Sequence, residues 1–161
     1  MRQTVVETAQ PPFRWVDVVA PEPGELEALA REFGFHPMSV EDCLDPWHLP
    51  KYEHFGETTF VILRVFDDRS SEGSANVQEM TRKIAVFFRP DLVVTIHRAD
   101  LAIVAGVRER FRGGNGGHCA TTPLVGALFN AALDSFEAPL ERDEDTVDSF
   151  EVALQIGRAH V

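Results

Sequence analysis

Cysteine is scarce in this sequence. Cys43 and Cys119 are its two cysteines among 161 residues, and they form no CxxC pair. The composition therefore gives no sign of a disulfide framework and is typical of a protein from a reducing, cytosolic setting.

Positive charge is also scarce, because 15 Lys and Arg stand against 26 Asp and Glu, for a net charge of −11. Surfaces for nucleic acids or anionic membranes need clustered Lys and Arg, so cations are the more natural partners.

Long apolar runs are absent as well. Residues 1–12 contain none of the apolar run that a signal peptide needs. The longest nearly uncharged apolar segment, 123–133, is interrupted by Asn130 and is far shorter than the roughly 20 residues that span a bilayer. We therefore expect a soluble chain without an export signal.

Recognisable catalytic motifs are missing too. The sequence has no G-x-S-x-G, Walker A, G-x-G-x-x-G or H-E-x-x-H pattern. The acidic run 143–148 lacks the glycine that a calcium-binding EF-hand loop needs, so a solvated helix face is the better interpretation. A metal-dependent hydrolase could draw on one suggestive group of side chains, but their spacing matches no known ligand pattern. That group is His36, Glu41, Asp42, His48, His54 and His97. We expect no enzymatic activity.

The chain has the composition of a globular protein, with 44% apolar and 25% charged residues. β-branched and aromatic runs predict strands, and apolar residues at three- and four-residue spacing predict helices. The segment 58–66 is apolar on both faces and predicts a central strand, whereas 51–56 is interpreted as a connector. The expected strands are 14–19, 58–66, 79–88 and 92–97, the last two forming a hairpin, and the expected helices are 23–33, ended by Gly34, then 39–44 and 101–111.

A glycine-rich stretch divides the chain. We expect an α/β domain over 1–112, a linker over 113–120 and an acidic helical part over 121–161. The last part is predicted to be one long helix or two helices joined near Pro139.

Two adjacent carboxylates, Glu41 and Asp42, are the most informative candidate site. Neighbouring helical residues point about 100° apart, so the pair cannot chelate one ion tightly by itself. The pair could still offer oxygens to an ion, Mg²⁺ above all, that is shared with another surface. On the residues alone we favour a structural explanation, in which Ser39 caps a short helix and the carboxylates interact with its N-terminal dipole.

Several motifs, taken in order, resemble the cytoplasmic N-terminal domain of CorA-type magnesium transporters, a family that includes ZntB-like zinc transporters. Each motif is weak alone, and their order and spacing make the resemblance specific over about residues 15–151. They are Trp15-Val16-Asp17, Phe33-Gly34-Phe35-His36-Pro37, Val40-Glu41-Asp42-Cys43-Leu44, Pro50-Lys51-Tyr52-Glu53, Phe60-Val61-Ile62-Leu63-Arg64, Ile84 to Phe88, Leu92 to Arg98, and Val107-Arg108-Glu109-Arg110.

The resemblance implies an α/β (α+β) fold with a mixed parallel and antiparallel sheet flanked by helices, followed by a helical pair. It also implies the cytoplasmic part of a homopentameric channel of the cell inner membrane. The family's stalk helix, membrane spans and Gly-Met-Asn signature do not occur in this sequence. We therefore expect the soluble domain alone, unable to conduct ions and a monomer or dimer by itself.

The resemblance further implies that Asp42 and Glu41 hold a regulatory Mg²⁺ ion at a subunit interface and favour the closed pore, with Zn²⁺, Co²⁺ or Ni²⁺ as other possible ions. A family carboxylate of the C-terminal helices falls at Asn130, which offers a carbonyl oxygen without charge, and Asp134 one turn later could substitute. Two alternatives remain open. One is a ZntB-like Zn²⁺ transporter, and the other is a stand-alone acidic module that binds a protein partner.

Overall fold

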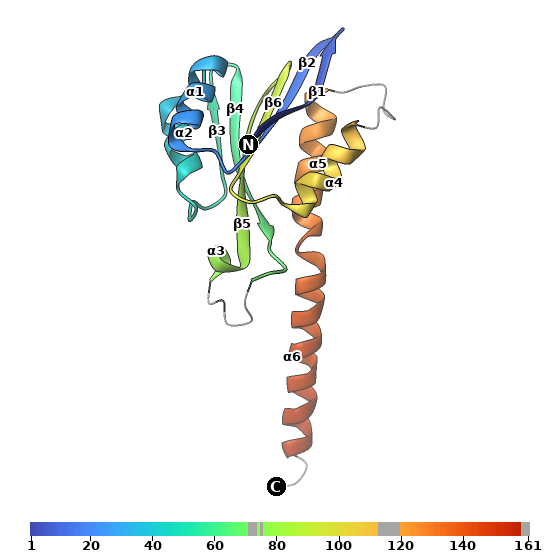
Figure 1. Ribbon diagram of the computed structural model, residues 1–161. Helices are drawn as coiled ribbons and strands as arrows, with labels where there is room; N and C mark the ends of the chain where they lie inside the picture. Colours follow the sequence, from blue (N-terminus) through green and yellow to red (C-terminus); the bar gives the residue numbers. More distant parts are fainter. Residues whose placement is uncertain (71–73, 75, 113–119, 159–161) are drawn as a thin grey trace.

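The protein folds around one mixed six-stranded sheet (Figure 1). The computed structural model describes residues 1–70, 74, 76–112 and 120–158. The strands run in the order β1-β2-β6-β5-β4-β3, and β2 pairs with β6 in parallel while the other neighbours are antiparallel. The strands are β1 Arg2–Ala9, β2 Pro12–Val19, β3 Lys51–Phe55, β4 Thr58–Phe66, β5 Thr81–Arg89 and β6 Leu92–His97. The helices are α1 Pro23–Phe33, α2 Pro37–Leu44, α3 Val77–Met80, α4 Ala102–Arg112, α5 Thr121–Asp134 and α6 Glu137–Arg158. The predicted α/β class with a mixed sheet is confirmed.

The two edge strands differ from the prediction. No strand was expected within residues 1–12, and 51–56 was interpreted as a connector, yet these segments contain β1 and β3 at the two edges of the sheet. Edge strands carry many polar and exposed residues, so they lack the continuous apolar pattern that marked β4. The strand predicted from Glu79 begins at Thr81, because the short helix α3 includes Glu79.

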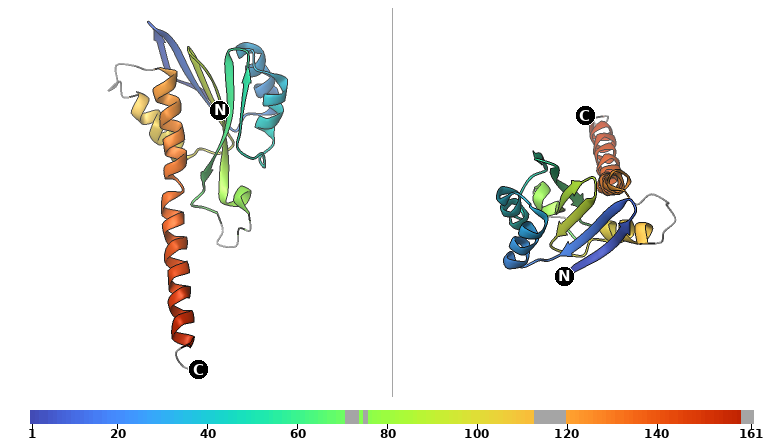
Figure 2. Two further views of the ribbon diagram at one scale, coloured as in Figure 1. Left: turned by 180° about the vertical axis from the view of Figure 1, so that it is seen from behind. Right: turned by 90° about the horizontal axis from the view of Figure 1, so that it is seen from above.

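Two hydrophobic clusters form on opposite faces of the sheet, because alternate side chains of a strand point to opposite sides. On one face, Leu26 and Phe33 of α1 and Cys43 of α2 pack over strand residues such as Phe87. On the other face, α4 and α5 cover the sheet, with Leu124 fully buried. Figure 2 shows these two groups of helices on either side of the strands.

Helix α1 ends where the sequence predicts. Gly34 adopts the left-handed conformation at φ 73° as the C-terminal cap, and its N–H binds the Ala30 carbonyl. Glycine adopts this conformation without the strain that a side chain would add, so the chain can turn sharply into α2.

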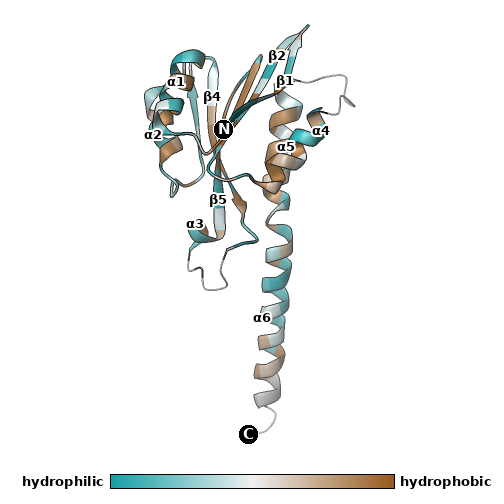
Figure 3. Ribbon diagram, in the orientation of Figure 1, coloured by the Kyte–Doolittle hydropathy of each residue, from teal (hydrophilic) through white to brown (hydrophobic). Residues whose placement is uncertain are grey.

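The C-terminal part consists of two helices, and the break lies at Ser135 and Phe136, before the predicted junction near Pro139. Proline is tolerated in the first turn of α6, where the backbone N–H groups have no helical partner. Helix α5 packs on the sheet, whereas α6 extends away from it with residues 140–154 exposed (Figures 1 and 3). No helix in the described part of the chain is long and apolar enough to cross a membrane. The predicted linker lies, apart from Ala120, outside the described residues, so the proposed division of the chain remains a prediction.

Candidate functional site

The short helix α2 presents the acidic pair at one edge of the sheet. Its N-terminal cap is His36, whose Nδ1 accepts a hydrogen bond of 3.3 Å from the Met38 N–H, and Pro37 begins the helix. The sequence placed the cap at Ser39, which is instead buried and donates its hydroxyl proton to the His36 carbonyl at 2.7 Å. The His36 ring stacks on Phe55 of β3 at a centroid distance of 4.3 Å, so α2 is held against the edge strand.

The two carboxylates of the pair have different surroundings. Glu41 is exposed, while Asp42 is half-buried and turned toward β3. The Asp42 Oδ2 atom lies 2.6 Å from Lys51 Nζ, and its Oδ1 atom lies 3.2 Å from His48 Nε2. This difference follows from the angular separation of neighbouring helical residues. As a result, Asp42 makes polar contacts with Lys51 and His48, whereas Glu41 faces solvent.

His48 is oriented by a second contact. Its Nδ1 lies 2.9 Å from the Leu49 carbonyl oxygen, which can only accept a hydrogen bond. Nδ1 therefore carries a proton, and Nε2 faces the Asp42 carboxylate, to which it donates a hydrogen bond when the ring is protonated. An imidazole nitrogen and a carboxylate oxygen, both atom types that bind metal ions, thus lie 3.2 Å apart.

Two buried cations hold the end of α2 and the following loop. Lys83 of β5 donates its ammonium protons to the carbonyls of Asp42, Cys43 and Asp45, and burial lowers the pKa of Lys83 against the attraction of Asp45. Arg64 of β4 donates to the His48 carbonyl at 2.9 Å. Both cations border a cavity of about 300 Å³. They are placed to fix the backbone that carries Asp42 and His48.

The neighbouring cysteine is expected to be unreactive. Cys43 is buried, and burial raises its pKa to about 12, so the thiol stays protonated at neutral pH. A thiolate ligand for a metal ion is therefore disfavoured at this position.

Asn130 and Asp134 lie elsewhere. Both are exposed on α5, one helical turn apart, and line a groove of about 840 Å³ that also includes Asp67 and Asp100. Because α5 and α2 cover opposite faces of the sheet, one chain does not bring these residues to Glu41 and Asp42. The four predicted site residues therefore form two separate groups.

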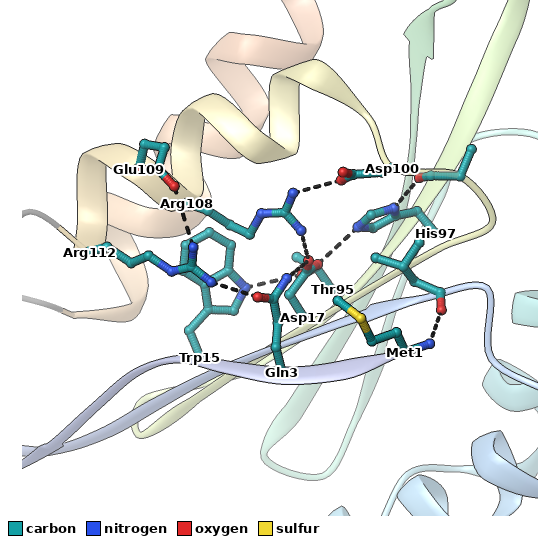
Figure 4. Close-up of polar contacts among 12 residues, drawn as sticks. Met1, Gln3, Trp15, Asp17, Thr95, His97, Asp100, Arg108, Glu109 and Arg112 are labelled. Carbon is teal, nitrogen blue, oxygen red and sulfur yellow. Dashed lines mark hydrogen bonds and ion pairs between the residues drawn. The ribbon is translucent and has the colours of Figure 1, made fainter.

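A buried group of charges on the α4 face was not predicted as a unit (Figure 4). We call Asp17, Thr95, His97 and Arg108 the Asp17 cluster. The fully buried Asp17 carboxylate lies 2.6 Å from Arg108 Nη1 and 2.9 Å from His97 Nε2, and it accepts a hydrogen bond of 2.5 Å from Thr95. The parallel pairing of β2 with β6 places Asp17 opposite Thr95.

The charges of the Asp17 cluster compensate one another. Burial alone would raise the pKa of Asp17, but hydrogen bonds and attraction from His97, Thr95 and Arg108 outweigh it and lower that pKa below its usual value. Arg108 also binds Asp100 at 2.6 Å. One signal was present in the sequence, since Asp17 interrupts an apolar strand and Arg108 falls within the apolar stripe of a helix.

The histidines considered for a hydrolase do not gather in one place. His36 caps α2, His97 belongs to the Asp17 cluster, and His54 on β3 lies 3.1 Å from Thr59 Oγ1. Among the residues that the structure describes, no three His, Cys, Asp or Glu side chains lie close enough together to hold a metal ion. Sequence reasoning also did not assign roles to Lys51 and Lys83, although Lys51 belongs to one of the quoted motifs.

The amino-acid sequence is similar to those of known metal-ion transporters. The magnesium transporter ALR2 of Saccharomyces cerevisiae is 30% identical over 149 residues, which cover 91% of this chain and 17% of that protein. The chain spans between 17% and 41% of the length of the curated relatives it matches.

Two solved structures share the fold. The CorA magnesium transporter of Methanocaldococcus jannaschii aligns with a TM-score of 0.65 and 17% identity, over 89% of this chain and 44% of that one. The ZntB cytoplasmic domain of Vibrio parahaemolyticus aligns with a TM-score of 0.67 and 13% identity, over 86% of this chain and 55% of that one. Residues 12–160 also match the sequence family described as CorA-like Mg²⁺ transporter protein, and the chain therefore belongs to that family.

Proposed function

We propose that this chain is the cytoplasmic regulatory domain of a CorA-like divalent-cation transporter of the cell inner membrane, with no enzymatic role. In this proposal Asp42, assisted by Glu41, holds Mg²⁺ at a contact between subunits of a homo-oligomer, a pentamer in the complete protein. The ion stabilises the closed assembly, and its loss at low Mg²⁺ allows opening. This is a population shift, because the ion binds one assembly state better than the other.

The position of Asp42 carries the proposal. Its carboxylate is 19% exposed at an edge of the sheet, and carboxylate oxygens suit Mg²⁺, which keeps several waters and often binds through one or two carboxylates. Asn130 and Asp134 lie on the opposite face of the same chain. An ion that joined both groups would therefore have to lie between two copies, which agrees with a role at a subunit interface.

The test is protection from proteolysis in the complete gene product that contains this chain. Millimolar Mg²⁺ should slow cleavage of the wild-type assembly, and Asp42→Asn should weaken this protection markedly. Asp91→Asn is a matched control, since Asp91 forms a surface ion pair with Arg89 at 2.9 Å. Equal protection of the wild type and Asp42→Asn would remove Asp42 from the proposal.

Zn²⁺ is a second candidate ion, and His48 is the observation that favours it. Its Nε2 atom lies 3.2 Å from Asp42 Oδ1, and imidazole suits Zn²⁺ better than Mg²⁺. If Zn²⁺ is the ion, His48→Gln should weaken protection by Zn²⁺ and leave protection by Mg²⁺ nearly unchanged. Protection by Mg²⁺ alone would reject this candidate.

A further inference from the structure

The chain has two lysines, and both contact the segment that carries Asp42. Lys83 binds backbone carbonyls at the end of α2 and leaves the Asp42 carboxylate free. Lys51 binds that carboxylate directly, with Nζ 2.6 Å from Oδ2. Asp42, the proposed metal ligand, is therefore already paired with a cation of the protein, the Lys51 ammonium.

Lys51 is shared between two carboxylates. Its Nζ lies 2.6 Å from Asp42 Oδ2 and 3.0 Å from Glu53 Oε2. The ammonium also lies 5.9 Å from the centre of the Phe60 ring. Burial would lower the pKa of Lys51, but the hydrogen bonds with Asp42 and Glu53 raise it overall, so the side chain is charged at neutral pH.

An ammonium ion and Mg²⁺ cannot share this oxygen without strong repulsion. Mg²⁺ binds oxygen at about 2.0–2.1 Å and requires a nearly regular octahedral shell, which a nitrogen 2.6 Å from the same oxygen would obstruct. Two cations so close together repel each other even in water. At Oδ2 the metal ion therefore has to replace the ammonium, and at Oδ1 it would lie beside both the ammonium and the His48 ring.

We infer that Lys51 is an internal competitor for the divalent cation, which binds Asp42 only after the ammonium turns toward Glu53. This inference rests on the proposed function, in which Asp42 is a ligand of the ion. Lys51 acts through Asp42 and sets the cation concentration to which the domain responds.

Glu53 makes this exchange feasible. Lys51 and Glu53 are two residues apart on β3 and share the face turned toward the helices, so the ammonium keeps a counter-ion when it leaves Asp42. The Oε2 atom of Glu53 already lies 3.0 Å from Lys51 Nζ, so the ammonium needs only a small side-chain movement to leave Asp42. Removing Glu53 should therefore hold Lys51 on Asp42 and weaken metal binding.

The experiment is a Mg²⁺ titration of the complete gene product that contains this chain, followed by calorimetry and by protection from proteolysis. Lys51→Met should tighten binding by roughly tenfold or more, because the competing charge is gone. Lys51→Arg keeps the charge and should bind no more tightly than the wild type, while Glu53→Gln should weaken binding. Arg14→Met is the charge-matched control and should change nothing, because Arg14 pairs with Glu7 near the opposite edge of the sheet.

The outcomes separate this inference from the function on which it rests. If Asp42→Asn abolishes Mg²⁺ binding and Lys51→Met leaves it unchanged or weaker, Lys51 positions Asp42 and the inference is wrong, while the proposed function stands. If neither the wild type nor Lys51→Met binds Mg²⁺ in a manner that depends on Asp42, both are wrong. Far-ultraviolet circular dichroism of each variant checks that the fold is retained.

Discussion

Two aspartates of this protein have nearly the same partners and opposite surroundings. Asp17 lies 2.6 Å from Arg108 and 2.9 Å from His97, and its side chain is fully buried. Asp42 lies 2.6 Å from Lys51 and 3.2 Å from His48, with 19% of its side chain exposed. The contact distances are similar, so they do not decide what each aspartate can do.

Burial and the nature of the cation make the difference. At Asp17, Arg108 presents a rigid fork whose other arm holds Asp100, and no solvent can replace a lost partner. At Asp42, the partner is a flexible lysine that also contacts a second carboxylate, and all three side chains are partly exposed. A buried pair cannot exchange partners without leaving a charge uncompensated, whereas a partly exposed pair can. We therefore interpret the Asp17 cluster as structural and the Asp42 contacts as exchangeable.

The largest expected effect is on folding stability. Asp17→Asn should lower the free energy of unfolding by about 3–5 kcal/mol, because Arg108 would keep only the exposed Asp100 as a counter-ion and the buried hydrogen bonds to the Asp17 carboxylate would be weakened. Asp42→Asn should cost clearly less, about 1 kcal/mol, because its ion pairs are partly exposed to solvent. Urea denaturation of both variants measures the difference. Equal losses would show that burial does not separate the two sites.

The difference in stability between the wild type and Asp17→Asn should depend on pH. The folded protein holds the pKa of Asp17 below its usual value, so the stability that this carboxylate contributes is fully present above about pH 4, the ordinary Asp value. It is lost as the pH falls further, through the folded pKa. In urea titrations at successive pH values, the gap between wild type and Asp17→Asn should stay constant near neutrality and narrow below about pH 4. A gap that widens on acidification would contradict this assignment.

The buried Lys83 and the partly exposed Lys51 test the same dependence of stability on burial, with a smaller expected effect. Lys83→Met should destabilise the protein by about 1–3 kcal/mol, because carbonyls at the end of α2 would lose a buried donor. Hydrogen exchange should rise first at residues 42–48. Unchanged exchange there would show that Lys83 does not fix this segment.

Lys51→Met should change stability least, by less than about 1 kcal/mol, since its ion pairs are 21% exposed on the lysine side. Its effect should appear instead in the affinity for Mg²⁺. A loss as large as that of Lys83→Met would mean that Lys51 is a structural residue. Thermal unfolding without metal ions measures the stability difference between the two lysine variants.

Much of the fold could be read from local patterns. The apolar stripe of α1, its glycine stop and the two strands flanking Pro90 were predicted with nearly the observed bounds. The edge strands β1 and β3 were missed, because their pairing with β2 and β4 and not their own composition makes them strands. The cap of α2 was misplaced, because either His36 or Ser39 satisfies the local requirement for a side-chain acceptor.

The candidate site was predicted only in part. The sequence singled out Glu41 and Asp42, but it could not show that Asp42 faces Lys51 and His48 while Glu41 faces solvent. It also gave no indication that Asn130 and Asp134 lie on the opposite face of the sheet. These relations depend on where α2, β3 and α5 pack, and packing joins residues far apart along the chain.

The sequence by itself determined the mixed α/β character, the acidic charge and the family, because these follow from periodicity, composition and ordered motifs. Only the tertiary structure decided that Asp17 is enclosed by Arg108, Thr95 and His97 while Asp42 stays within reach of solvent. The physical reason is that the strength of a charge pair depends on the dielectric and on the partners around it. Both are set by residues brought together from distant parts of the chain.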